Sequence, residues 1–200
     1  MSHSSSQADI DAFVMSAYTG TLTPQEVKIA VASRGIPVNE RHSTWGWTAL
    51  HWAVRCKRFE LVVALLAAGA SPNVTDDHSL TSVWWAAYDG TADILQLLID
   101  GGGGGSVNEL NGYGITPLIA LAGNNCGDAA ARLQVLLACS ELDLDATYDG
   151  KTAEECAMDS GHSQLAVAIA EERVRRERWS ALRASWIGVA VTRLLAASYI

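Results

Sequence analysis

Cysteine, phenylalanine and charged side chains are scarce in this chain of 200 residues. It has four cysteines, two phenylalanines and 18% charged residues. The cysteines are scattered and form no Cys-x-x-Cys pair, which predicts a reduced, intracellular protein and disfavours a disulfide framework or a zinc site. Residues 1–6 contain no hydrophobic signal core and no glycine for myristoylation. We therefore expect a cytoplasmic protein, with the nucleus as an alternative.

Positive charge is also scarce, except at the end of the sequence. Residues 1–170 carry eight Lys and Arg against nineteen Asp and Glu, whereas residues 171–200 carry six Arg against three Glu. A strongly acidic body argues against binding to nucleic acid phosphates. The same charge is compatible with a basic peptide or a protein surface as partner.

Catalytic and metal-binding patterns are missing as well. The five histidines lie far apart, and no serine sits in a Gly-x-Ser-x-Gly turn. The glycine run 101–105 lacks the following Lys-Ser/Thr of a nucleotide loop, so we expect a flexible loop insertion there. The sequence thus predicts a protein that is not an enzyme and needs no metal or cofactor.

The most regular feature is a threonine that recurs at intervals of 33, 35 and 36 residues: Thr48, Thr81, Thr116 and Thr152. A period of this length indicates stacked supersecondary units, which generally bind other molecules rather than transform them. Because the chain is rich in alanine and leucine, the units should be stacked helices.

The clearest unit begins at Gly46 and reads Gly-Trp-Thr-Ala-Leu-His-Trp-Ala-Val. Two segments of helical periodicity follow, closed by Gly69, and residues 71–80 are polar and suited to a hairpin. This pattern resembles the ankyrin repeat, whose consensus contains Gly-x-Thr-Pro-Leu-His-x-Ala. The resemblance covers about residues 8–170. It implies a mainly α solenoid of about five repeats with short β-hairpin or loop tips.

In this register the chain divides into successive segments. We expect a flexible N-terminus (1–7), a degenerate first repeat (8–45), three repeats (46–78, 79–113, 114–149), a terminal repeat (150–170) and a C-terminal amphipathic and apolar helix (171–200). The consensus histidine, which bonds neighbouring repeats in this family, is kept at His51. Trp84, Ile119 and Glu155 replace it in the later repeats, so a more individual stacking is predicted there. The turn between the helices of the third repeat, 123–128, is about three residues longer than the pattern.

Partners of ankyrin repeats usually dock on the concave side, on hairpin tips and outward positions of the first helices. The resemblance places these residues there: Trp47, Trp52, Arg55, Asp77, His78, Leu80, Trp85, Tyr88, Asp89, Tyr113, Ile115, Asn124, Tyr148 and Asp149. Trp52 and Trp85 are the expected anchors, because large rigid rings favour binding. Trp84, at the inter-repeat histidine position, is expected to pack between repeats. The aspartates suit a basic peptide.

The C-terminal segment lies outside the resemblance. Residues 171–178 are charged, and Trp179, Leu182, Trp186 and Val189 then form an apolar stripe at three-four spacing. Arg193 disfavours a transmembrane helix. The stripe is expected to fold back on the last repeat or to insert into a partner, with an interfacial helix as the alternative.

The function predicted from the sequence is a non-catalytic adaptor or scaffold. It would bind a protein partner on the concave face and make a second assembly contact through the C-terminal helix. Two alternatives stay open: a membrane-peripheral regulator anchored by that helix, and the targeting part of a larger enzyme.

Overall fold

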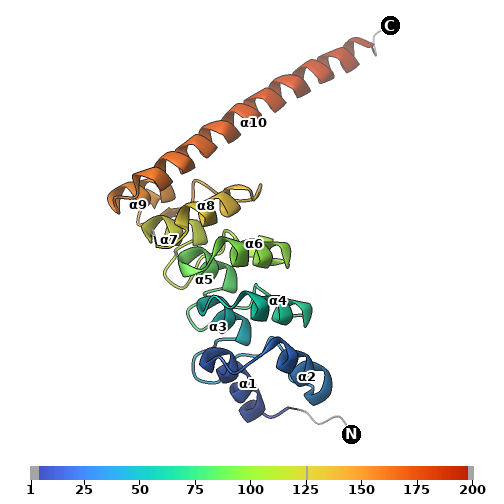
Figure 1. Cartoon of the computed structure of the whole chain (residues 1–200). Coiled ribbons are helices and arrows are strands. Elements are labelled where there is room, and N and C mark those ends of the chain that lie inside the picture. Colours follow the sequence, from blue (N-terminus) through green and yellow to red (C-terminus); the bar gives the residue numbers. More distant parts are fainter. Residues whose placement is uncertain (1–4, 125, 198–200) are drawn as a thin grey trace.

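The computed structural model describes residues 5–124 and 126–197, with side chains placed as far as Ala184. Paired antiparallel helices stack along one axis, and a long helix leaves the stack at its C-terminal end (Figure 1). The protein is mainly α with short hairpin tips, as the sequence predicts. The elements are α1 (Gln7–Thr19), α2 (Pro24–Arg34), α3 (Ala49–Arg55), α4 (Phe59–Ala67), α5 (Ser82–Asp89), α6 (Ala92–Asp100), the 3-10 helix η1 (Gly103–Ser106), α7 (Pro117–Gly123), α8 (Ala129–Leu137), β1 (Thr147–Tyr148), β2 (Lys151–Thr152), α9 (Ala153–Asp159) and α10 (Ser163–Ala197).

The recurring threonines are the N-caps of α3, α5, α7 and α9. Each side-chain oxygen accepts a hydrogen bond from the backbone N–H three residues later, at 3.1–3.4 Å. This bond satisfies one of the backbone donors left free at the start of a helix. The threonine period is therefore the period at which a first helix begins.

The larger of two hydrophobic clusters in the described residues runs through the stack, from Ile10 in α1 to Ile169 in α10. Its members are mostly Leu, Val, Ile and Ala, and the small alanines let successive helix pairs approach closely. Two rows of polar contacts also join neighbouring repeats.

The first row lies near the helix N-termini. His51 Nε2 donates to the carbonyl oxygen of Leu80 at 3.1 Å, and Trp84 Nε1 donates to that of Ile115 at 3.2 Å. Ile119 has no donor side chain, and the Glu155 carboxylate accepts from its own N-cap residue, Thr152, instead. The same side-chain position thus links neighbouring repeats at two successive interfaces, and among the described residues the later repeats lack this hydrogen bond.

The second row consists of asparagines at the end of each hairpin-facing turn. Asn39 Nδ2 donates to Gly69 O, Asn73 Nδ2 to Gly102 O and Asn108 Nδ2 to Glu141 O, at 3.1, 3.0 and 2.6 Å. Each asparagine lies 34 or 35 residues after the previous one. These acceptors lie in the segments that follow α4, α6 and α8, so the bonds tie the end of each second helix to the preceding repeat.

Side chains in the turn between paired helices, or in the first turn of the second helix, also reach back to the preceding repeat. Arg58 donates to Ala17 O, Arg132 to Ala87 O and His162 to Ala122 O. Each acceptor is a carbonyl group in the last turn of a first helix, so these side chains act as C-terminal caps. The long turn 123–128 adds to this capping, because Asn124 Nδ2 donates to Tyr88 O at 2.9 Å.

The glycine run differs from the expected flexible insertion. Residues 103–106 form η1, in which Gly103 and Ser106 are buried. A Cβ at Gly103 would lie 2.7 Å from Val83 Cγ2 and 2.7 Å from Leu98 O. Glycine is required there for close packing on α5 and α6, not for looseness of the chain.

The helix α10 contains 35 residues and joins the second helix of the last repeat to the C-terminal segment without a break. Two arginines fix its direction. Arg173 donates to Glu154 and to Leu144 O, and Arg176 donates to Leu137 O, Cys139 O and Leu142 O at 3.0, 2.9 and 2.7 Å. Beyond Arg176 the helix points away from the stack and does not fold back on it (Figure 1).

Of the apolar stripe predicted on this helix, Trp179 and Leu182 are exposed. The side chains of Trp186 and Val189 lie outside the described residues. Within the described residues, no helix combines the length and the apolar character needed to cross a membrane.

Candidate binding surface

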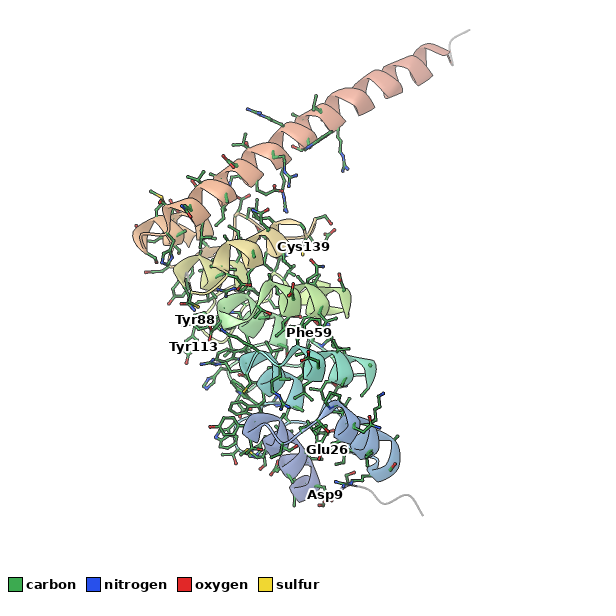
Figure 2. All side chains as sticks on the ribbon, in the orientation of Figure 1. Asp9, Glu26, Phe59, Tyr88, Tyr113 and Cys139 are labelled. Atoms are coloured by element: carbon green, nitrogen blue, oxygen red, sulfur yellow. The ribbon has the colours of Figure 1, made fainter. Side chains whose placement is uncertain are left out.

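The first helices present two equivalent rows of outward positions. Four residues after the capping threonines stand Trp52, Trp85, Ala120 and Cys156; seven residues after them stand Arg55, Tyr88, Gly123 and Asp159. The rows therefore change character along the stack, from large rings in the early repeats to small side chains in α7. In Figure 2, Tyr88 and Tyr113 lie on the edge formed by the first helices, and Phe59 lies among the second helices.

The large rings form a continuous aromatic row. The ring centroids of Tyr18 and Trp52 are 4.4 Å apart, those of Trp52 and Trp47 4.3 Å, and those of Trp47 and Trp85 5.0 Å. Trp85 is followed by Tyr88 at 6.3 Å. These spacings are typical of favourable tilted and edge-on contacts between rings. The row is thus preformed, which lowers the entropy cost of presenting it to a partner.

The expected anchors Trp52 and Trp85 are half-buried members of this row. Their indole Nε1 atoms are buried and have no hydrogen-bond partner within the described residues. Each therefore offers the outer part of its ring, not its polar group. Trp84, in contrast, is buried between repeats, as expected from its position.

Beyond the aromatic row lies an open hollow of about 460 Å³. Its lining comes from three successive repeats: Trp84, Tyr88, Ile115, Ile119, Ala120, Gly123, Asn124, Tyr148, Asp149, Lys151, Cys156, Asp159 and Ser160. The hollow arises from the two rows themselves. Where earlier repeats carry Trp85 and Tyr88, α7 carries Ala120 and Gly123, which leave the space of a large side chain unfilled.

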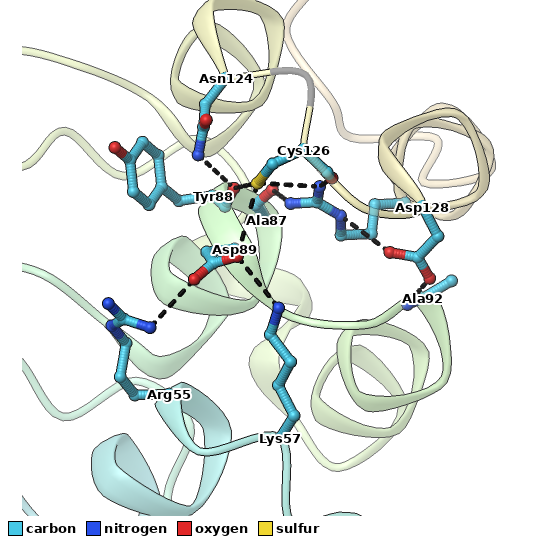
Figure 3. A network of polar contacts seen from close by, with 10 residues as sticks. Arg55, Lys57, Ala87, Tyr88, Asp89, Ala92, Asn124, Cys126 and Asp128 are labelled. Carbon is cyan, nitrogen blue, oxygen red and sulfur yellow. Dashed lines mark hydrogen bonds and ion pairs between the residues drawn. The ribbon is translucent and has the colours of Figure 1, made fainter.

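Charged groups next to the row are paired with one another (Figure 3). Asp89 accepts from Arg55 at 2.9 Å and from Lys57 at 3.0 Å. Burial by itself would raise the pKa of Asp89, but the hydrogen bonds from Lys57 and Cys126 and the charges of Lys57 and Arg55 lower it on balance. The guanidinium of Arg55 also lies 5.8 Å from the centroid of the Trp85 ring, where a cation–π contact is favourable.

The acidic charge available to a basic partner is therefore smaller than the sequence suggests. Asp77 is paired with Arg41, and Asp159 with Lys151 at 2.6 Å. Asp149 is exposed at the hairpin tip between β1 and β2 and has no ion-pair partner in the described part of the chain. It is the acidic group at the hollow that remains open to a ligand.

The prediction that Leu80 lies on the binding surface is wrong, because its side chain is buried. It is 7% exposed and packs with Trp84 and Ala120, because the hairpin turns its side chain under the neighbouring repeat. Tyr113 is 66% exposed, and its ring lies 6.3 Å from that of His78. Ile115 is half-buried against Trp84.

Three residues of this region carry no obvious sequence signal. Tyr18 extends the aromatic row to α1, and Trp45 lies 6.3 Å from Trp52; both lie outside the clear repeat register. Arg132 is 1% exposed, and its guanidinium binds Ala87 O, Cys126 O and the Asp128 carboxylate. A charged residue on a predicted helix gives no sign of such burial.

The described residues contain no cluster of three His, Cys, Asp or Glu side chains suited to a metal ion. The surface consists of rings, a hollow and paired charges, which together suit recognition of another molecule.

Stacked helix pairs, capping threonines and bonded hairpin tips define a solenoid repeat protein. Models of the ankyrin repeat match residues 45–77, and models of three ankyrin copies match residues 83–176. The chain belongs to the ankyrin-repeat family, and its repeats are a protein–protein interaction module.

Relatives with matching segments are much longer proteins. The chain is 40% identical over 97 residues to a mitochondrial disaggregase of Bos taurus, with 48% of this chain and 14% of the relative covered. It is 32% identical over 128 residues to the nuclear factor NF-kappa-B p105 subunit of Gallus gallus, covering 64% and 12%. It is 34% identical over 94 residues to the B-cell lymphoma 3 protein homolog of Mus musculus, covering 46% and 21%. The chain thus spans at most about a fifth of the length of these relatives.

Proposed function

We propose that this protein is a non-catalytic adaptor that holds a partner protein along the first-helix face. The observation that carries the proposal is the preformed aromatic row that ends in an apolar hollow at Ala120 and Gly123. Rigid rings beside an unfilled space are the arrangement in which interface hot spots concentrate.

The hollow suggests the chemistry of the bound segment. Its apolar lining suits one large hydrophobic or aromatic side chain, and Asp149 at its edge suits a neighbouring Lys or Arg. The acidic body of the chain would also favour the approach of a basic segment. We propose a cytoplasmic or nuclear location for this interaction. We also propose that residues 8–170 form five repeats.

The helix α10 is proposed to provide a second contact, since it leaves the stack with Trp179 and Leu182 exposed. A rigid stack with one contact on its face and another on its arm would hold two components at a fixed distance.

The hollow can be tested without disturbing the core. A Cβ at Gly123 meets no atom within 4 Å, so Gly123→Trp should fold and fill the hollow. A photo-crosslinking residue at Tyr148 should capture a partner in cells expressing the wild-type chain and lose it in the Gly123→Trp background. The matched control places the same residue at Phe59, an exposed ring on the second-helix side. Equal capture from both positions, or capture unaffected by Gly123→Trp, would remove the proposal.

A further inference from the structure

The outward face of α10 carries an unusual combination of exposed apolar and charged residues. Val167, Val174, Trp179 and Leu182 are 55%, 44%, 62% and 52% exposed. An open hollow of about 720 Å³ runs along this face, lined by Ala170, Glu171, Val174, Arg175, Arg178, Trp179 and Leu182. Soluble proteins seldom leave such a stripe uncovered unless it is an interaction site.

Most of this face is the side of α10 that does not meet the stack. Trp179 lies at its edge, two turns after Glu172 and exposed at 62%. The helix packs on the last repeat through Leu165, Ile169, Glu172 and Arg176, which recur at helical spacing. The outward residues form two rows at intervals of four: Val167, Glu171, Arg175 and Trp179 in one, and Ala170, Val174, Arg178 and Leu182 in the other. Rows of this kind are the ridges by which two helices interlock.

The two rows are complementary to themselves when one helix is reversed. About a midpoint between Val174 and Arg175, Glu171 stands opposite Arg178, and Val167 stands opposite Leu182. The first pair is acid against base, and the second is apolar against apolar. Ala170 and Trp179 lie on the two opposite edges of this face, because residues nine apart are half a turn round an α-helix.

The charges decide the direction of such a pairing. A parallel pair in register would set Glu171 against Glu171 and Arg178 against Arg178, whereas the antiparallel pair joins opposite signs twice. Neither Glu171 nor Arg178 has an ion-pair partner in the described part of the chain. Arg175, next to the midpoint, is bonded to Glu172 of its own helix at 2.6 Å, so it brings little repulsion to the axis.

We propose that α10 is a homodimerisation helix, which binds a second copy of this chain antiparallel about a two-fold axis between Val174 and Arg175. A two-fold interface uses the same patch on both subunits, which is what the self-complementary rows provide. The proposal specifies the occupant of the second contact assigned to α10 above, and it is independent of the hollow on the first-helix face.

Charge reversal tests the pairing directly. In sedimentation equilibrium of the full chain, Glu171→Arg and Arg178→Glu should each weaken dimerisation at least about tenfold, because each creates two like-charge pairs. The double variant Glu171→Arg/Arg178→Glu should restore the wild-type association. Arg183→Glu is the matched control and should leave association unchanged, because this exposed arginine lies two turns after Arg176, on the stack-facing side of the helix.

Three results would contradict this expectation. A chain that is monomeric throughout the micromolar range, or a double variant that stays dissociated, would overturn the two-fold pairing. Equal weakening by Arg183→Glu would show a general charge effect instead.

An anionic membrane as occupant gives a different signature. Vesicles of phosphatidylcholine and phosphatidylserine would bind Glu171→Arg more strongly and Arg178→Glu more weakly than wild type, since only net positive charge matters there. That pattern, without dimerisation, would replace the proposal. Gly123→Trp should leave dimerisation intact. The proposal for the hollow and the proposal for the dimer can therefore be rejected independently of each other.

Discussion

Trp84 takes the place of a histidine as a link between repeats: its Nε1 donates to the carbonyl oxygen of Ile115 at 3.2 Å. His51 Nε2 donates in the same way to Leu80 O, one repeat earlier, at 3.1 Å. Both acceptors directly precede the threonine that caps the next first helix. Two different side chains thus satisfy the same carbonyl position, and the indole adds a large ring to the face beside it.

Removing this donor should destabilise the stack. Trp84→Phe removes one of the two donors to Ile115 O, since the Asn111 N–H still donates to this oxygen at 3.1 Å. It should lower the free energy of unfolding by about 0.5–1.5 kcal/mol, measured by urea denaturation. Trp85→Phe is the matched control, because the Trp85 Nε1 has no partner to lose within the described residues. Equal losses from the two variants would mean that ring volume, not the hydrogen bond, is what matters at position 84.

His51 should make stability dependent on pH. Burial lowers the pKa of His51 to about 4 from an ordinary value of 6.5, so the unfolded chain binds the proton more tightly than the folded one. The stability is complete above the unfolded pKa and falls as pH drops towards the folded pKa. Between about pH 7 and about pH 5 the loss from this residue should be about 2 kcal/mol.

The measurement is urea denaturation at the two pH values for wild type and His51→Gln. The variant should be less stable at neutral pH but should lack most of the loss on acidification. A wild-type stability that does not change across this window would contradict the burial of a neutral His51.

Gly103 and Gly104 form a matched pair within η1. Gly103→Ala places a methyl group 2.7 Å from Val83 Cγ2 and should cost about 1–3 kcal/mol through overpacking. Gly104→Ala meets no atom within 4 Å and should be neutral or slightly stabilising. Thermal unfolding of the two variants distinguishes a packed turn from a loose one, in which both substitutions would be tolerated.

Arg132 is a buried charge whose removal should be costly. Arg132→Met removes the side-chain donor to Ala87 O and Cys126 O, whereas Asp128 stays solvated because its side chain is 42% exposed. We therefore expect a loss of about 2–4 kcal/mol, mainly from the two carbonyl acceptors. Arg55→Met removes a largely exposed arginine from Asp89 and should cost no more than about 1 kcal/mol. Chemical denaturation measures the loss of unfolding free energy for each variant. Equal losses would contradict this account of Arg132.

Much of the fold follows from periodic residues in the sequence. Thr48, Thr81, Thr116 and Thr152 mark helix starts because a hydroxyl at the N-cap has one local partner, three residues on. The position of Trp84 between repeats follows from the same register. These features depend on neighbours in sequence, and a one-dimensional pattern records them well.

Features that depend on the next repeat are harder to predict. The repeat pattern places Leu80 on the surface, because its position in the hairpin tip is an exposed one, but the neighbouring Trp84 and Ala120 bury it. The pairing of Asp89 with Arg55 and Lys57 joins residues more than thirty positions apart, and the burial of Arg132 depends on the turn that precedes it. The hollow arises from what is missing in α7, which only a comparison with α3 and α5 reveals.

The free end of α10 lies far from the point where the helix is attached to the stack. Among the residues whose side chains are described, the last hydrogen bonds of α10 to the stack are those of Arg176. From there to Ala197 the helix extends about 30 Å at about 1.5 Å per residue. A rotation of about 10° at this point would sweep the far end through about 5 Å. Because α10 packs on α9, and α9 contributes Cys156 and Asp159 to the hollow, a small displacement of α9 by a bound side chain would be magnified several-fold at the tip.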